Sequence, residues 1–246
     1  MIGAAADWII PDWPAPASVR ACVTTRTGGV SQQPFDSFNL GDHVEDDPRA
    51  VASNRSLLTS RLNVQPAWLQ QVHGTRMVEA DPAQLLEADA SWSRKPGVAC
   101  TIMTADCLPA LFCNRDGTQV AAAHAGWRGL AAGVLEAALD SFDCEPSQIM
   151  VWLGPAIGPQ SFEVGAEVRD AFVDALPGTA IAFAPSLNTG RYMANIYSLA
   201  RLRLASSGVT EVHGGGEDTV VDPRFYSYRR AARTGRFASL VWLAPT

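Results

Sequence analysis

Residues 103–129 read MTADCLPALFCNRDGTQVAAAHAGWRG and contain two apolar runs separated by the polar turn NRDGT. Short apolar runs bounded by turn residues are typical of buried strands. Cys107 stands at the start of the first run, and His124 stands at the end of the second. A polar atom at the end of a buried strand needs a partner. We therefore expect these two side chains to share one.

The segments on either side mix strands and helices in no regular order. Residues 67–80 predict two strand segments around a break at His73 and Gly74, and residues 119–142 predict a strand that passes into a helix through Gly126 and Gly129. Further helices are predicted at 47–62, with Asp47 as N-cap, at 166–176 and at 192–208. Further strands are predicted at 20–27, 148–153, 210–216 and 236–244, and residues 97–114 form an apolar run that is interrupted at residues 105–107. This irregular mixture favours an α+β fold with mixed sheets. No linker or repeat interrupts the chain, so we expect one domain over residues 1–246.

Composition and charge exclude several classes of function. The 246 residues are 47% hydrophobic and 18% charged, with a net charge of −6, which gives no electrostatic footprint for nucleic acid or anionic membranes. No apolar run approaches the roughly 20 residues needed to cross a bilayer, and the N-terminus lacks the features of a signal peptide. Five cysteines at irregular spacing indicate reduced thiols rather than a disulfide framework. We therefore expect a cytoplasmic protein that binds small molecules. We also expect a monomer, because no amphipathic surface stripe is evident in the sequence.

The strand ends carry a candidate metal site. The chain has four histidines, and two of them, His73 and His124, stand beside breaks close to the Cys107 break. One Cys and two His from separate loops form a plausible ligand set for zinc that leaves a fourth position open. Spacing alone leaves other interpretations in place: a buried apolar thiol, a hydrogen-bonded turn histidine and a helix-flanking histidine. His43, in an acidic stretch, is interpreted as a solvated loop residue, and His213 is left open.

Arginines and carboxylates in the same motifs are candidates for substrate binding and proton transfer. Arg128 follows Gly126 at a predicted helix start, where backbone N–H groups favour anions. A surface arginine explains Arg128 equally well. Arg26 and the pair Arg229 and Arg230 are candidates to line the same anion site, although solvated surface charge is the better interpretation of them on local sequence alone. Asp106 and Glu163 are candidate proton-transfer groups, or caps of turns.

Six strings together carry a family resemblance: TTRTGGVSQQPFDSFNLGDHVEDDP, QVHGTRMV, TADCLPALF, AAAHAGWRGLAAGV, LGPAIGPQSFEVG and FYSYRRAARTGRFASL. They resemble the bacterial family once called laccase-domain or polyphenol oxidase proteins. This family is now described as purine nucleoside phosphorylases, with one branch described as a peptidoglycan editing factor. The resemblance implies a four-layer α/β/β/α sandwich with mixed sheets, similar to the catalytic fold of the cytotoxic necrotizing factors.

The same resemblance implies that His73, Cys107 and His124 bind one zinc ion and serve catalysis. It also implies substrate-binding roles for Arg26, Asn39, Arg128 and Arg229. Family members often carry a Cys-Thr pair shortly before the SYRR motif, where this chain has Asp218 in place of the cysteine. Asp218 therefore joins Asp106 and Glu163 as a candidate general acid.

The implied activities are phosphorolysis of adenosine, inosine and S-methyl-5′-thioadenosine, together with deamination of adenosine, with nucleoside and phosphate as partners. The physiological substrate is left open. One alternative is a metal-free hydrolase or amidase that edits a peptidoglycan precursor, with Cys107 as nucleophile and a histidine as base. Another is a module that binds a nucleoside or precursor without turnover. A multicopper laccase is excluded because four histidines cannot furnish several copper centres, although copper is possible as an adventitious or alternative metal at the one site.

Overall fold

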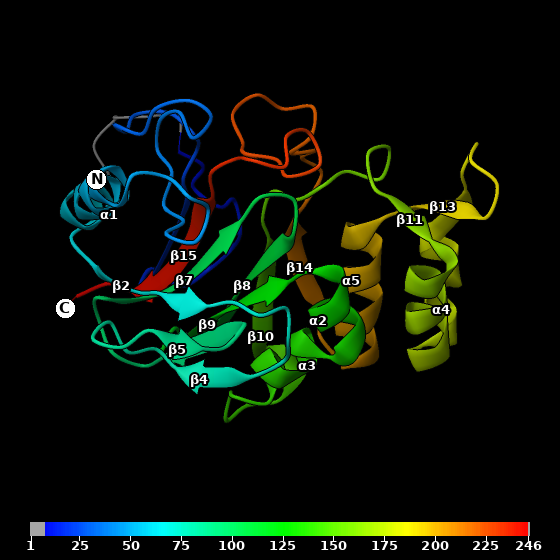
Figure 1. Cartoon of the computed structure of the whole chain (residues 1–246). Coiled ribbons are helices and arrows are strands. Elements are labelled where there is room, and N and C mark those ends of the chain that lie inside the picture. Colours follow the sequence, from blue (N-terminus) through cyan, green and yellow to red (C-terminus); the bar gives the residue numbers. More distant parts are fainter. Residues whose placement is uncertain (1–7, 246) are drawn as a thin grey trace.

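The two apolar runs of residues 103–129 form neighbouring strands at the centre of the largest sheet (Figure 1). The computed structural model describes residues 8–245. Strands β8 (Leu108–Asn114) and β9 (Val120–Ala125) pair antiparallel, with Leu108 opposite Ala125. The six-stranded sheet has the order β14-β10-β8-β9-β6-β4, and its other strands are β14 (Glu211–Gly214), β10 (Ile149–Leu153), β6 (Ala90–Ser93) and β4 (Met77–Glu79). The pairs β10–β14 and β4–β6 are parallel, so this sheet is mixed.

A second, four-stranded sheet has the order β1-β15-β7-β2. Its strands are β1 (Val19–Val23), β15 (Phe237–Leu243), β7 (Val98–Thr104) and β2 (Gln65–Ala67), of which β2 pairs parallel to β7 and the others are antiparallel. Strand β7 lies in this sheet and β8 lies in the other, so the chain crosses between the sheets at Ala105, Asp106 and Cys107. The apolar run of residues 97–114 is therefore two strands in two sheets.

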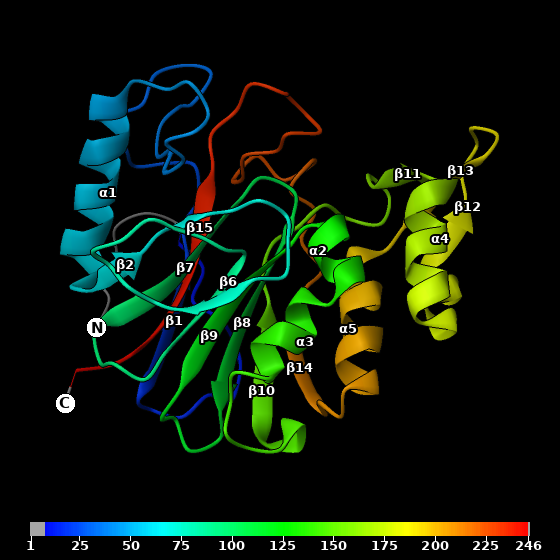
Figure 2. The same cartoon turned by 60° about the horizontal axis from the view of Figure 1, so that its bottom comes forward.

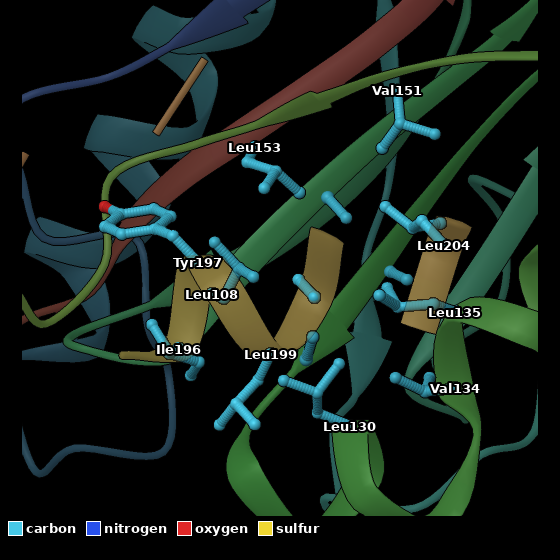
Figure 3. Close-up of a cluster of buried hydrophobic side chains, with 14 of the residues drawn as sticks. Leu108, Leu130, Val134, Leu135, Val151, Leu153, Ile196, Tyr197, Leu199 and Leu204 are labelled. Carbon is cyan, nitrogen blue, oxygen red and sulfur yellow. The ribbon is translucent and has the colours of Figure 1, made fainter. Parts of the chain in front are cut away.

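Alternation along the strands divides the buried side chains into three clusters. Ile102 on β7 and Leu111 on β8 belong to a cluster shared by the facing sides of the two sheets. Helix α1 (Pro48–Leu62) packs through Leu58 against the other side of the four-stranded sheet, and its cluster includes Leu240. Helices α2 (Trp127–Ala132), α3 (Val134–Leu139) and α5 (Ile196–Ser206) cover the other side of the six-stranded sheet (Figures 2 and 3).

The leucines and valines of this third cluster interlock between the sheet and the helices (Figure 3). Leu108 and Val151 come from the sheet, whereas Leu130, Leu135 and Leu199 come from α2, α3 and α5. Each is fully buried, which stabilises the fold by roughly 1.5–3 kcal/mol for such a side chain. The helices that flank the end of β9 are thus held firmly against the sheet.

Two smaller sheets complete the structure. Strands β11 (Glu163–Gly165), β13 (Arg191–Ala194) and β12 (Phe183–Pro185) form one, which lies with helix α4 (Ala166–Ala175) on the side of the molecule away from α1 (Figure 1). The short strands β3 (Leu69–Gln70) and β5 (Leu86–Glu87) form the other, and the 3₁₀ helices are η1 (Pro146–Gln148) and η2 (Pro177–Ala182). No helix in residues 8–245 is long and apolar enough to cross a membrane.

The sequence predictions are largely confirmed, with two corrections. Helix α1 ends at Leu62, and the Asp47 carboxylate caps it by accepting a hydrogen bond from the Arg49 N–H at 2.9 Å. The helix predicted at 192–208 is wrong at its start, because residues 191–194 pair in β13 and the helix follows Asn195, whose side chain caps it. The helix predicted after Gly126 is split into α2 and α3 at Gly133, whose φ is 105°. The α+β class with mixed sheets is confirmed, whereas the four-layer description and the likeness to cytotoxic necrotizing factors stay predictions.

Candidate metal centre

Three side chains from distant parts of the chain meet beside the crossover between the sheets. His73 follows β3, Cys107 lies between β7 and β8, and His124 lies near the end of β9. Their ligand atoms all lie within 4.8 Å of one another, and Cys107 Sγ lies 3.9 Å from His73 Nε2. Tetrahedral zinc with its usual bond lengths separates N and S ligands by about 3.5 Å. The structure thus brings together the three residues predicted to form a metal site, and the set fits a metal ion.

A fourth residue, Asp89, holds the two histidines in place. Its carboxylate accepts a hydrogen bond from His124 Nδ1 at 2.8 Å, which leaves His124 Nε2 available to a metal. It also accepts hydrogen bonds from the backbone N–H groups of Val72, His73 and Gly74 at 3.1, 2.8 and 2.7 Å. Asp89 is fully buried. Carboxylates that orient metal-binding histidines in this way are a regular part of metal sites.

The backbone at the site adopts conformations that place these groups. His73 has a φ of 62° and Asp106 a φ of 96°, both in the left-handed region that non-glycine residues rarely adopt. At His73 the strained turn aims successive N–H groups at the Asp89 carboxylate. Such strain is concentrated at functional sites.

The charges of the cluster favour metal binding. Burial opposes ionisation of the Cys107 thiol, but the imidazoles of His124 and His73 outweigh it and lower the pKa of Cys107 to about 6. Burial likewise opposes a charge on His124, whereas Cys107 and Asp89 raise its pKa. Because the thiolate is the form that binds metals and attacks electrophiles, Cys107 is prepared for either role at neutral pH.

The cluster lines a cavity of about 470 Å³. One part of the lining is apolar and comprises Met103, Trp127, Ile157, Phe162 and Ile196. The other part carries three guanidinium groups, those of Arg128, Arg229 and Arg236, together with His43 and Tyr228. Asp106 is the one carboxylate in the lining among the described residues. A cavity with this lining suits a ligand that has a flat apolar part and an anionic part.

Two of the four predicted substrate-binding residues line this cavity. The guanidinium of Arg229 donates to the backbone carbonyls of Ser161 and Glu163 at 3.2–3.3 Å, and that of Arg128 stacks on the Trp127 ring. Arg26 lies outside the lining, where it pairs with Asp36 at 3.2 Å.

Asn39 also lies outside the lining and is fully buried. Its side-chain oxygen accepts hydrogen bonds from the backbone N–H groups of Gly41 and Arg236. The structure thus places Asn39 behind the cavity wall.

Of the three candidate acids, only Asp106 lines the cavity. Its carboxylate accepts hydrogen bonds from Thr219 Oγ1 at 2.7 Å and from the Arg229 N–H at 2.6 Å. Glu163 lines a separate pocket, where its carboxylate accepts hydrogen bonds from the side chains of Ser186 and Asn188. Asp218 accepts a hydrogen bond from Ser161 Oγ at 2.5 Å.

Several cavity residues lie outside the sequence predictions. His43, interpreted as a solvated loop residue, is exposed and also lines the cavity, whereas His213 lies on β14 outside it. No local pattern in the sequence marks Arg236, or Asp89 behind the metal ligands, and each residue directly precedes a strand, β15 and β6 respectively. No pattern in the sequence marks Gln71 either. Its side-chain amide lines the cavity, donates to the Met103 carbonyl and accepts from the Met103 N–H, each at 2.8 Å.

Known proteins resemble the chain over nearly its whole length. A family model described as multi-copper polyphenol oxidoreductase laccase matches residues 20–244. A purine nucleoside phosphorylase of Pseudomonas aeruginosa is 70% identical over 237 residues, which span 96% of this chain and 98% of that protein. The purine nucleoside phosphorylase YfiH of Escherichia coli strain K12 is 51% identical, again over 96% of this chain and 98% of that protein.

Solved structures share the fold. A Neisseria meningitidis protein superposes with a TM-score of 0.94 at 48% identity, covering 97% of this chain and 100% of that chain. The protein YlmD from Geobacillus stearothermophilus superposes with a TM-score of 0.84 at 29% identity, covering 95% and 94%.

Proposed function

Because the chain belongs to the multi-copper polyphenol oxidoreductase laccase family, whose curated relatives are named purine nucleoside phosphorylases, we propose that it is a metal-dependent purine nucleoside phosphorylase. One observation carries the proposal: the Cys107, His73 and His124 cluster opens into the same cavity as three guanidinium groups. The first feature suits a metal ion, and the second suits phosphate. The metal we propose is zinc, because one thiolate and two imidazoles are its usual donors. Copper is the alternative.

The reaction transfers a ribosyl group from a purine to phosphate. The C1′–N9 bond breaks, a phosphate oxygen forms a bond to C1′, and a proton is delivered to the departing purine, so that adenosine and phosphate give adenine and ribose 1-phosphate. The ribose becomes oxocarbenium-like as the bond breaks, and groups that hold an anion beside C1′ favour this change. Bound zinc would supply a Lewis acid that stabilises negative charge at this place. Arg128 and Arg229 balance the charge of the phosphate.

The cavity can accommodate the proposed substrates. Its volume of about 470 Å³ falls within the range of 300–1,000 Å³ that is usual for small-molecule sites. Met103, Ile157 and Phe162 offer an apolar surface for a purine or for a methylthio group. We therefore include adenosine, inosine and S-methyl-5′-thioadenosine among the substrates. Asp106 is the proposed proton-transfer group, since it is the candidate acid that lines the cavity.

Deamination of adenosine is a second proposed activity of the same cavity. It requires a water molecule directed at C6 of the purine instead of phosphate directed at C1′. The two reactions therefore differ in how the nucleoside lies relative to the Cys107 cluster. Both depend on the same metal ligands.

One observation favours a different enzyme. The pKa of Cys107 is lowered to about 6, with an imidazole 3.9 Å from its sulfur, which is also the arrangement of a nucleophilic cysteine. The alternative is thus a metal-free hydrolase or amidase that edits a peptidoglycan precursor. In that case a chelator leaves activity unchanged and iodoacetamide abolishes it.

Metal analysis and turnover on the same samples test the proposal. Wild-type protein and Cys107→Ala are analysed by inductively coupled plasma mass spectrometry, and release of adenine and ribose 1-phosphate from adenosine and phosphate is followed by chromatography. We expect about one zinc per chain in the wild type, with both zinc and adenine release lost in Cys107→Ala. Cys113→Ala is the matched control, because Cys113 is buried on β8 away from the cavity. Full turnover without metal contradicts the proposal.

A further inference from the structure

Arg236 stands in the cavity as a half-buried cation without a carboxylate partner. Its Nη1 donates to the backbone carbonyls of Thr234 and Gly235 at 3.0 Å each, and within residues 8–245 no ion pair involves it. Burial lowers the pKa of its guanidinium, and the acidic groups of Cys107, Asp106 and Tyr228 act in the opposite direction. A half-buried guanidinium that opens into a cavity is a ready partner for an anion.

The motif FNLGD, residues 38–42, holds Arg236 in place by hydrogen bonds and by close packing. Asn39 Oδ1 accepts hydrogen bonds from the N–H groups of Arg236 and Gly41 at 2.8 and 2.9 Å. Asn39 Nδ2 in turn donates to Gly41 O and to Asp46 Oδ2 at 3.0 and 2.9 Å. A Cβ atom at Gly41 would lie 2.8 Å from Arg236 Cγ, so only glycine allows the side chain to pass. The motif thus fixes both the backbone and the stem of Arg236.

A hydroxyl group lies at the same end of the neighbouring strand. Thr104 on β7 pairs with Phe237, the residue that follows Arg236, and both Thr104 and Arg236 line the cavity. Thr104 is 2% exposed, and its Oγ1 has no hydrogen-bond partner in the described part of the chain. A buried hydroxyl without a partner costs free energy unless a ligand satisfies it.

The remaining charges of the cavity favour an anion here. Both oxygens of Asp106 already accept hydrogen bonds, from Thr219 and from the backbone of Arg229. The guanidinium of Arg229 is held by carbonyl groups of Ser161 and Glu163. Arg229 donates through both terminal nitrogens, whereas Arg236 donates through Nη1 alone, so the other nitrogens of the Arg236 guanidinium are left for an anion.

We propose that Arg236 and the hydroxyl of Thr104 form the phosphate-binding subsite of this cavity, and that Asn39 acts as a positioning residue for Arg236. This inference rests on the proposed phosphorylase function, because it identifies where the phosphate lies. It also assigns an indirect role to Asn39, for which the family resemblance implies a role in substrate binding.

Calorimetric titration with inorganic phosphate tests the subsite without requiring turnover. The metal-loaded wild type is compared with Arg236→Gln, Arg236→Lys and Thr104→Val, and Arg233→Gln is the matched control because Arg233 is exposed in the same segment outside the cavity. We expect the phosphate Kd to rise about 10- to 100-fold in Arg236→Gln, by less in Arg236→Lys and Thr104→Val, and to stay unchanged in Arg233→Gln. A wild type that binds no phosphate, or an Arg236→Lys and an Arg236→Gln variant that both bind it as well as wild type, overturns the inference.

Kinetics separate this inference from the proposed function. If the wild type phosphorolyses adenosine, we expect Arg236→Gln to raise the KM for phosphate. The KM for adenosine and the metal content should stay unchanged. We also expect Asn39→Ala to raise the KM for phosphate, and to add little when Arg236 is already replaced. Additive effects of Asn39→Ala and Arg236→Gln overturn the positioning role. A wild type that binds phosphate through Arg236 and yet releases no adenine overturns the proposed function alone.

Discussion

Asp89 and His124 form the buried contact on which the geometry of the metal centre depends: the carboxylate accepts a hydrogen bond from Nδ1 of the imidazole at 2.8 Å. The same carboxylate accepts three N–H groups from the turn that contains His73. One side chain therefore orients two of the three metal ligands, although neither histidine is near it in the sequence. Its removal would loosen the cluster without touching Cys107.

Asp89→Asn is expected to weaken metal binding while the fold persists. The amide keeps the shape of the carboxylate, but an NH₂ group then faces N–H donors and the negative charge is lost. Replacement of such partners typically costs 10- to 100-fold in metal affinity, and we expect a loss of about that size in a competition titration with a chromophoric chelator. Asp140→Asn, at the exposed end of α3, is the control. Unchanged metal affinity in Asp89→Asn would show that the Asp89 carboxylate is not needed to orient His73 and His124.

Gly126→Ala is expected to disrupt the metal centre by steric contact alone. A Cβ atom at this position would lie 2.7 Å from His73 Cδ2 and 3.2 Å from Cys107 Sγ. The backbone of Gly126, at φ −61° and ψ 155°, suits alanine, so the effect is confined to the two ligands. We expect a large loss of metal content with a small change in thermal midpoint. Gly178→Ala, whose Cβ atom would have nothing within 4 Å, serves as the control.

The sequence predicted the elements that depend on local patterns. Helix α1 follows from Asp47, Pro48 and the apolar spacing after them, and strands β8 and β9 follow from their two apolar runs. The start of β13 was missed because residues 191–194 are strand only through pairing with β11 and β12. Tertiary pairing of this kind overrides helical spacing.

The candidate site divides in the same way. His73, Cys107 and His124 stand at visible breaks in apolar segments, so their side chains were predicted, and the structure brings them together. Asp89 and Arg236 act through contacts with segments 15 or more residues away, and no local pattern marks them. Long-range hydrogen bonds leave no periodic signal in a sequence.

Asn54→Ala is expected to destabilise the segment that carries FNLGD. The buried amide of Asn54 on α1 accepts from the Val30 N–H at 2.9 Å and donates to Ser31 Oγ, Ser37 O and Asn39 O. Its loss leaves buried donors and acceptors without partners, which costs about 1–3 kcal/mol of stability. The free energy of unfolding, measured in urea, should therefore fall by about that amount. Ser56→Ala, at an exposed position of the same helix, should leave it nearly unchanged.

Alkylation of the metal-stripped protein is expected to select Cys107 and to report its pKa. The imidazoles of His124 and His73 outweigh burial and lower that pKa to about 6, whereas burial raises the pKa of Cys22, Cys100 and Cys113 to about 12. Burial and the nearby carboxylates of Asp116, Asp143 and Glu145 also raise the pKa of Cys144. Because the thiolate is the reactive form, the rate of modification by iodoacetamide should be low below pH 6, rise through pH 6 and level off above pH 7. Mass spectrometry should show one modified cysteine, absent in Cys107→Ser, and bound metal should protect it. A rate that rises only near pH 8.5, as for an ordinary thiol, would show that the imidazoles do not stabilise the thiolate.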